Sequence, residues 1–221
     1  MPYRREPNMK GFKVVVFDLD GTLTTERSIW QHIHRVLGTW EGHAEHFQRL
    51  FLAGSISYEE FCRRDAMVWK GMRADDLRAI ADSVPYHAGV FELRDFLRAK
   101  GLRLAGISSG LSILSTRVER ELGLDFSVAN DLLVEKGVLT GEVRIKVAHD
   151  GKRTWMEEVM RRFGVQGREI VAVGDSRGDL GMFSLSGFRV SFNSSSPELV
   201  READLVVESA DLADLIPRLP L

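Results

Sequence analysis

Short apolar runs alternate with amphipathic segments along most of the chain. The runs are rich in β-branched residues and end at polar or glycine positions, which is typical of buried strands. The clearest are residues 14–17, 102–107, 170–174, 188–192 and 205–207. We expect two further short strands at 126–129 and 132–134, the second paired in a hairpin with 138–143. Strands that alternate with helices predict an α/β fold, a parallel sheet with helices on both faces.

Residues 25–85 interrupt this alternation. Their apolar positions follow helical spacing, Ser28 is a candidate N-cap, and Ser57-Tyr58-Glu59-Glu60 forms a capping box. An all-helical insertion directly after the first strand predicts a cap over the crevice of the sheet. We therefore divide the chain into a core domain, residues 1–24 and 86–221, and a helical cap domain, residues 25–85.

Composition excludes several classes of protein. The 221 residues are 44% hydrophobic and 28% charged, with a net charge of −2 from interspersed acids and bases. This balance provides no basic patch of the kind that binds nucleic acid or membranes. The single cysteine, Cys62, excludes an internal disulfide. The polar N-terminus lacks the apolar stretch of a signal peptide, so we expect a cytoplasmic protein. We also expect a monomer or homodimer. A translation start at Met9 instead of Met1 would make residues 1–8 a disordered leader.

Polar residues gather where the predicted strands end. They are Asp18 and Asp20 after the first strand, Ser108 and Ser109 after the second, and Asp175 and Asp179 after the strand at 170–174. The carboxyl ends of parallel strands line the ligand crevice of such sheets, and Lys152 begins a helix that can face the same crevice. Each residue alone is more simply a turn, cap or surface residue. Their joint placement favours one shared site.

The chemistry of this set points to phosphate esters. Two carboxylates one residue apart at the end of a buried strand need a cation, and Mg²⁺ takes oxygen ligands from residues such as Asp18, Asp20 and Asp175. Asp18 suits a nucleophile that forms an aspartyl-phosphate, and Asp20 suits the acid and base. Ser108, the backbone after it, and Lys152 suit the phosphate oxygens.

Four motifs resemble those of the haloacid dehalogenase superfamily of phosphohydrolases. In chain order they are Phe17-Asp-Leu-Asp-Gly-Thr22, Ile107-Ser-Ser-Gly110, Lys152 and Gly174-Asp-Ser-Arg-Gly-Asp179. The similarity runs from about Lys10 to near the end of the chain and is closest to the phosphoserine phosphatase group, which residues 121–125, 128–130 and 139–143 also resemble.

This resemblance implies a Rossmann-like core, Mg²⁺, and a role for each motif residue. Asp18 would be the nucleophile, Asp20 the acid and base, and Asp175 a metal ligand. Asp179 would anchor the water shell of the metal, and Ser108 and Lys152 would hold the phosphate.

The chain departs from that group at several positions. Gly21, Ser109 and Gly178 stand where the group has Ser, Gly and Asn. The group grips phosphoserine with a cap glutamate and a cap arginine. Ungapped alignment puts Arg27 and Asp65 at these positions, with the charges reversed, and Glu26, one residue away, is the alternative for the glutamate. We take Arg27, Tyr58, Asp65 and Trp69 as the hypothetical substrate contacts of the cap.

The leading hypothesis is a Mg²⁺-dependent phosphomonoester hydrolase acting on a small metabolite, with phosphoserine as the first named substrate. Alternatives are a phosphatase for another small ester, or a phosphotransferase to an alcohol acceptor such as homoserine. A receiver-like regulatory domain also has acids at strand ends, but it has no need of Asp20 or of the helical insertion. A catalytically inactive scaffold would lack a motif residue, and none is missing.

Overall fold

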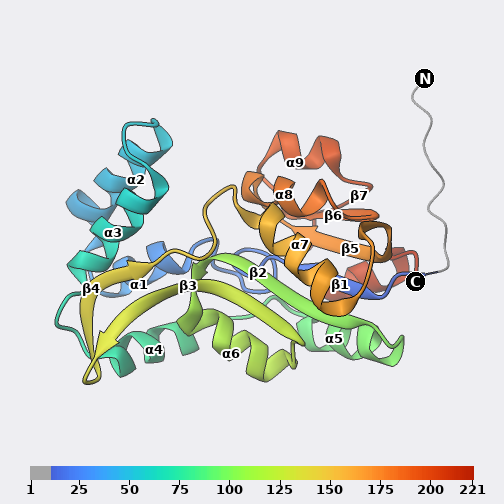
Figure 1. Ribbon diagram of the computed structural model, residues 1–221, viewed down its shortest axis with the longest axis horizontal. Helices are drawn as coiled ribbons and strands as arrows, with labels where there is room; N and C mark the ends of the chain where they lie inside the picture. The colour runs from blue at the N-terminus through green and yellow to red at the C-terminus, as the bar shows by residue number, and fades with distance from the viewer. Residues whose placement is uncertain (1–10) are drawn as a thin grey trace.

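The computed structural model describes residues 11–221, so the two alternative starts, Met1 and Met9, lie outside the described residues. A seven-stranded sheet in the order β4-β3-β2-β1-β5-β6-β7 runs through the molecule (Figure 1). Its strands are β1 (Val14–Phe17), β2 (Arg103–Leu111), β3 (Phe126–Glu135), β4 (Val138–Arg144), β5 (Ile170–Gly174), β6 (Phe188–Phe192) and β7 (Leu205–Val207). Neighbouring strands are parallel except β3 and β4. The predicted α/β class is confirmed.

The helices fall into two groups along the chain. Residues 25–85, which follow β1, contain the helices of the first group: α1 (Ile29–Val36), η1 (Trp40–Ala44), α2 (Glu45–Leu52), α3 (Tyr58–Val68) and α4 (Ala74–Asp82). The others are α5 (Val90–Ala99), α6 (Ser112–Leu122), α7 (Lys152–Phe163), α8 (Leu180–Phe183) and α9 (Pro197–Glu202), with short turns η2 (Gly167–Glu169), η3 (Arg177–Asp179) and η4 (Leu212–Arg218). We call residues 25–85 the cap segment.

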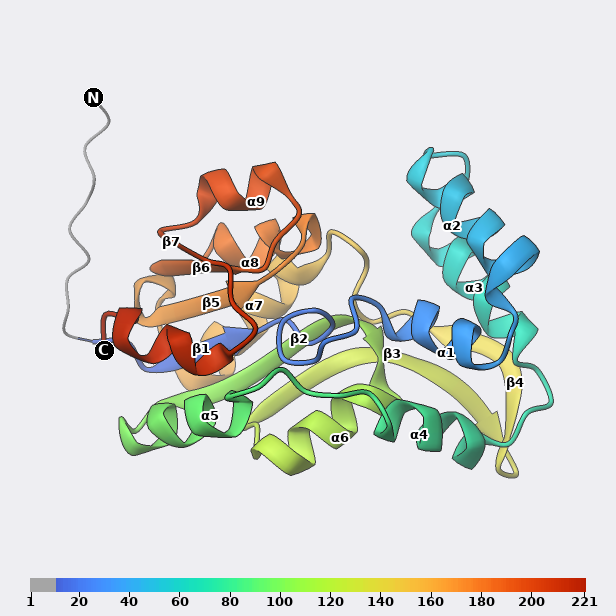
Figure 2. The same cartoon turned by 180° about the vertical axis from the view of Figure 1, so that it is seen from behind.

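Both faces of the sheet are buried. Val14 and Val16 of β1 pack in one apolar cluster, and Val15 and Phe17 in another, because side chains alternate along a strand. Helices α7, α8 and α9 cover the first face, whereas α5, α6 and the helices α1 and α4 of the cap segment contribute to the second cluster. Figure 2 shows α5, α6 and α4 in a row along that second face. Two-sided burial explains the continuous apolar runs of the sequence.

The strand order brings the polar strand ends together. β1 lies between β2 and β5, and Phe17 is in register with Gly106 on one side and Val173 on the other. From β1 the chain continues to β2 on one side of the sheet and later returns to add β5 on the other side of β1. Such a reversal of strand order opens a crevice at the carboxyl end of β1. Asp18 therefore sits at the switch point of the sheet.

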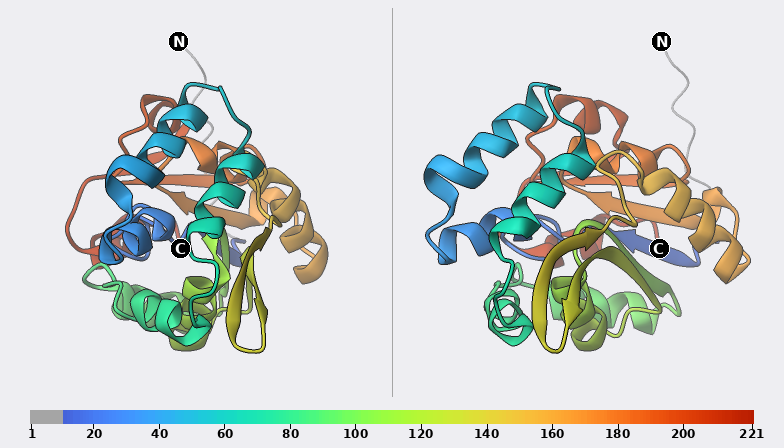
Figure 3. Two further views of the ribbon diagram at one scale, coloured as in Figure 1. Left: turned by 90° about the vertical axis from the view of Figure 1, so that its left-hand side faces the viewer. Right: turned by 60° about the vertical axis from the view of Figure 1, so that its left-hand side comes forward.

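Strand β3 differs from its prediction. The sequence predicts two short strands separated at Asn130, but β3 runs unbroken and forms a long hairpin with β4. The buried Asn130 accepts hydrogen bonds from the backbone of Lys146 and Val147 and donates to the carbonyl of Ser109, so a polar residue fits inside the strand. The hairpin extends to the cap segment, where the N–H of Gly71 donates to the carbonyl of Leu139 (Figure 3).

Strand β2 also runs further than predicted. It continues past Ile107 to Leu111, with a register shift against β3 between these residues. The irregularity lies at Ser108-Ser109-Gly110, so the second motif forms the distorted end of a strand and not a loop.

Cys62 behaves as a packing residue. It is fully buried in α3, and burial raises the pKa of its thiol to about 12. The thiol therefore stays protonated and unreactive at neutral pH. Within residues 11–221, no helix combines the length and apolar character needed to cross a membrane.

Candidate active site

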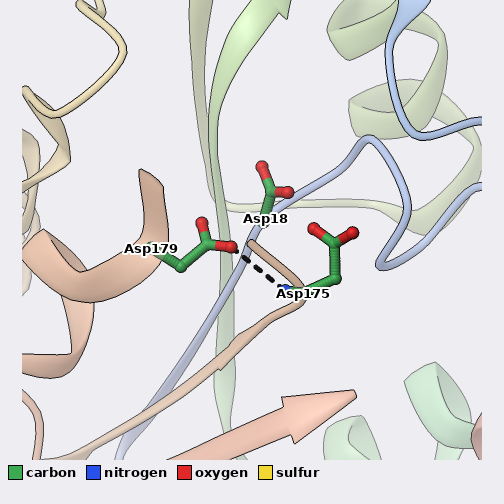
Figure 4. Close-up of side chains that lie close together, drawn as sticks. All are labelled: Asp18, Asp175 and Asp179. Carbon is green, nitrogen blue, oxygen red and sulfur yellow. Dashed lines mark hydrogen bonds between the residues drawn. The ribbon is translucent and has the colours of Figure 1, made fainter. Parts of the chain in front are cut away.

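Three carboxylates meet at the switch point of the sheet. Asp18 follows β1, Asp175 follows β5, and Asp179 ends η3 (Figure 4). One oxygen from each lies within 4.8 Å of the others, and all three side chains are buried. Buried like charges at this separation repel strongly, so the cluster needs positive charge.

Lys152 supplies one positive charge to this cluster. It is the first residue of α7 and is 2% exposed. Its Nζ donates to Asp18 Oδ1 at 2.5 Å and to Asp179 Oδ1 at 2.6 Å. Burial acts against the ammonium charge, but the carboxylates of Asp179 and Asp18 outweigh it and raise the pKa of Lys152. Lys152 is thus a fixed cation between two acids.

Asp179 also braces the turn that carries Asp175. Its Oδ2 accepts hydrogen bonds from the N–H of Asp175 at 3.0 Å and of Ser176 at 2.9 Å, the first drawn as the dashed line in Figure 4. The hydroxyl of Ser176 donates to the same oxygen at 3.2 Å. Asp179 therefore links the turn after β5 to Lys152.

Asp20 is held from two sides. Ser108 Oγ donates to its Oδ2 at 3.0 Å, and the N–H of Ile29, at the start of α1, donates to its Oδ1 at 2.9 Å. The N–H of Gly110 donates to Ser108 Oγ at 2.8 Å. A Cβ at Gly110 would lie 2.3 Å from Asp20 Oδ2, so only glycine fits there. Burial raises the pKa of Asp20 to about 6.

The charge balance of the site fits a divalent cation. Burial and the Asp179 carboxylate raise the pKa of Asp18 well above its usual value and that of Asp175 to about 7. Together with Asp20, four buried carboxyl groups face the single ammonium of Lys152. Burial thus raises the pKa of Asp18, Asp20 and Asp175 even beside the ammonium of Lys152. An oxygen-only donor set of this kind suits a hard cation such as Mg²⁺.

Family membership follows from comparison with known proteins. A model of the haloacid dehalogenase-like hydrolase family matches residues 15–184. The chain belongs to this family. The resemblance seen in the four motifs is therefore confirmed.

Phosphoserine phosphatases stand out among the relatives in this family. The chain is 28% identical over 205 residues to the phosphoserine phosphatase of Methanocaldococcus jannaschii, covering 92% of this chain and 96% of that one. A solved phospho-aspartyl intermediate analogue of phosphoserine phosphatase has a TM-score of 0.83 at 27% identity, covering 95% of this chain and 100% of that one. A substrate-bound phosphoserine phosphatase complex also has a TM-score of 0.83, at 26% identity, with 95% and 99% covered. Family and relatives indicate a phosphatase.

The hypothetical cap contacts separate into two pairs. Arg27 is exposed, and the hydroxyl of Tyr58 donates to the carbonyl of Ser109 in the second motif at 2.5 Å. Asp65 and Trp69 are fully buried in the interior of the cap segment. The structure thus brings Arg27 and Tyr58 to the motif residues of this haloacid dehalogenase-like hydrolase, and it does not bring Asp65 or Trp69 to an open surface.

Asn130 is a site residue that the sequence reasoning missed. It is fully buried, and its Nδ2 donates to the carbonyls of Ser109 at 2.8 Å and Val147 at 3.1 Å. It thereby ties the second motif to the loop that precedes Lys152. The available signal was an Asn within an apolar run, which needs buried partners.

Proposed function

We propose that the protein is a Mg²⁺-dependent phosphomonoester hydrolase that forms an aspartyl-phosphate on Asp18 and acts on a small metabolite of the phosphoserine type. The observation that carries this proposal is the buried set of Asp18, Asp175 and Asp179 around Lys152. The similarity to a phospho-aspartyl intermediate analogue of phosphoserine phosphatase supports it.

In the first step, a carboxylate oxygen of Asp18 attacks the phosphorus. The ester P–O bond breaks, and its electron pair passes to the leaving oxygen. The carboxylic acid of Asp20 donates a proton to that oxygen, which leaves as an alcohol. The hydroxyl of Ser108, the backbone of Ser109 and the ammonium of Lys152 hold the phosphoryl oxygens.

In the second step, water attacks the same phosphorus and the bond to Asp18 breaks. Asp20, now a carboxylate, takes the proton of the water. Inorganic phosphate leaves, and Asp18 and Asp20 return to their starting states. The hydrogen bond from the backbone N–H of Ile29 keeps the Asp20 carboxyl in place for both proton transfers.

The metal would be held by the carboxylates of Asp18 and Asp175 and by Asp20 through its backbone carbonyl, with Asp179 anchoring its water. When bound, the cation supplies positive charge that balances the phosphoryl oxygens. We further propose that residues 25–85 act as a cap domain over the core of residues 1–24 and 86–221. Cytoplasmic location and oligomeric state stay predictions from the sequence.

Phosphate release from a panel of phosphomonoesters, phosphoserine included, tests the proposal. We expect release that requires Mg²⁺ and falls about 10³-fold or more in Asp18→Asn, because the nucleophile is removed. Asp75→Asn, on the exposed start of α4, is the control and keeps its activity. Undiminished release by a folded Asp18→Asn protein would refute the assigned nucleophile. Phosphohomoserine formed with added homoserine would identify a phosphotransferase.

A further inference from the structure

A pocket of about 390 Å³ opens beside Gly21, the residue after Asp20. Its volume lies within the range of small-molecule sites. The residues that line it and bear on its chemistry are Gly21, Arg27, His87, Asn193, Ser194 and Glu208. Arg27 belongs to the start of the cap segment, and Gly21 and His87 flank the two ends of that segment. The other three residues lie in the loops after β6 and β7. The pocket therefore joins the cap segment to the core.

The pocket adjoins the carboxylate cluster. Gly21 has a φ of +80°, and a Cβ there would lie 2.5 Å from Asp175 Oδ2 and 3.3 Å from Arg27 Cγ. Asp175 and Arg27 thus flank the same glycine. A small ester whose phosphoryl group lies at Asp18 can extend its other end toward Arg27.

Arg27 is firmly positioned in this pocket. Its guanidinium donates to the carbonyl of Asn193 at 2.8 Å and to the hydroxyl of Ser195 at 2.9 Å. Asn193 has a φ of +48°, rare for a residue other than glycine. Its side chain holds that turn by donating to the carbonyl of Ser209 at 2.6 Å and accepting from the N–H of Ser209 at 2.9 Å. These two hydrogen bonds fix the turn whose carbonyl accepts from Arg27.

Arg27 keeps hydrogen-bonding capacity for a ligand. A guanidinium has five N–H donors, and the two contacts above do not use them all. Both acceptors are neutral, and within residues 11–221 Arg27 has no ion pair with a carboxylate. A planar, unpaired guanidinium is well suited to bind a carboxylate through two parallel hydrogen bonds.

Glu208 gives the pocket a charge of the opposite sign. It is exposed on the loop after β7, and it too has no ion pair within the described part of the chain. A ligand with only negative groups would meet repulsion from Glu208 and Asp175. A ligand with one carboxylate and one ammonium complements Arg27 and Glu208 together.

We propose that this pocket binds the leaving group of the substrate, with Arg27 on a carboxylate and Glu208 on an ammonium. The inference rests on the phosphatase function proposed above. It assigns recognition of the leaving group to Arg27 and Glu208, not to Arg27 and Asp65. Glu208, near the C-terminal end of the chain, thus takes the place of the buried Asp65 as the second specificity residue.

Four esters separate the two charges. Phosphoserine has both groups, phosphoethanolamine only the ammonium, phospholactate only the carboxylate, and 2-hydroxyethyl phosphate neither. For each we would measure kcat and KM with the wild type, Arg27→Gln and Glu208→Gln. We expect Arg27→Gln to reduce the preference for phosphoserine over phosphoethanolamine about tenfold or more, chiefly through KM. Glu208→Gln should similarly reduce the preference over phospholactate.

The pattern of losses decides the inference. Equal losses on all four esters in Arg27→Gln, with Arg78→Gln on α4 unchanged, would overturn it by showing a structural role alone. A wild type that prefers phospholactate to phosphoserine would overturn the role of Glu208. If the wild type hydrolyses no ester, p-nitrophenyl phosphate included, the proposed function fails. Calorimetric binding of phosphoserine and phosphoethanolamine to Asp18→Asn, with and without Arg27→Gln, then still tests the pocket.

Discussion

Two clusters of buried ionisable side chains in this molecule are built in opposite ways. At the strand ends, Asp18 and Asp179 both receive hydrogen bonds from Lys152, yet the acids outnumber the ammonium. Inside the cap segment, one histidine lies beside one acid, with His34 Nε2 3.5 Å from Asp65 Oδ1. Among the described residues, neither atom nor the second oxygen of Asp65 has a hydrogen-bond partner.

The shortage of positive charge at the strand ends and the missing hydrogen bonds in the cap segment have different consequences. The strand-end cluster lacks positive charge, which a bound cation can supply. The cap cluster lacks hydrogen bonds in a closed apolar interior, where Trp69 stacks on Trp30 with ring centroids 5.6 Å apart. Its polar atoms without hydrogen-bond partners lower the stability of the folded protein, and a ligand cannot reach them. A buried charge thus marks a site only where one sign is in excess and a ligand can reach it.

The largest effect is expected from removing the cation of the strand-end cluster. Lys152→Met leaves the buried Asp18 and Asp179 carboxylates unpaired, which should cost about 3–5 kcal/mol of unfolding free energy. Mg²⁺ should restore part of that loss, since it supplies the missing charge, while phosphatase activity stays at least about 10²-fold below the wild type. Urea unfolding with and without Mg²⁺, and phosphate release, measure both.

A surface lysine provides the matched control. Lys146 Nζ lies 2.7 Å from Asp131 Oδ2, with 37% and 25% of the two side chains exposed. Lys146→Met should cost less than about 1 kcal/mol and show no response to Mg²⁺ beyond that of the wild type. Equal stability losses in Lys152→Met and Lys146→Met would contradict the view that the strand-end cluster is short of positive charge.

A smaller effect is expected from the stacked rings of the cap cluster. Trp69 is fully buried between the rings of Trp30 and His34, the latter centred 4.6 Å away. Trp69→Leu should lower the unfolding free energy by about 3 kcal/mol, because it removes the stack and leaves a cavity. Trp40→Leu, at a half-buried ring, should cost about 1 kcal/mol. Similar urea midpoints for the two variants would refute a structural role for the stack.

Sequence alone predicts the strand-end cluster well for physical reasons. The apolar run of β1 permits burial on both faces, and the acids at its end can lie only at the carboxyl edge of a parallel sheet. The Gly after α6 and the Pro at the start of α9 mark helix ends by their backbone preferences. Fold class and motif positions follow from such local rules.

The cap was harder to predict because its contacts are not local. An ungapped alignment counts positions along helices, but it cannot tell which face of α3 carries Asp65 or that His34 of α1 lies against it. The pocket at Arg27 depends on Asn193 and Glu208, which follow β6 and β7 far along the chain. No periodicity in the sequence links these segments, so only the tertiary arrangement shows them together.

The smallest expected effect concerns the charge of Asp65. Burial raises the pKa of this carboxyl, although the nearby His34 and the more distant His43 act the other way. Between the ordinary pKa and the raised one, the folded protein keeps a proton that the unfolded chain has lost. The unfolding free energy therefore falls as pH rises through that interval. Asp65→Asn removes this contribution.

We therefore expect the stability of Asp65→Asn relative to the wild type to increase from pH 4 to pH 7. The amide has its own unpaired hydrogens, so the change with pH carries the test and not the value at one pH. Other acids with raised pKa values titrate in both proteins and cancel in the difference. Urea unfolding across this range decides the point: a constant difference would show that Asp65 titrates alike in the folded and unfolded chains, so that its pair with His34 fully offsets burial.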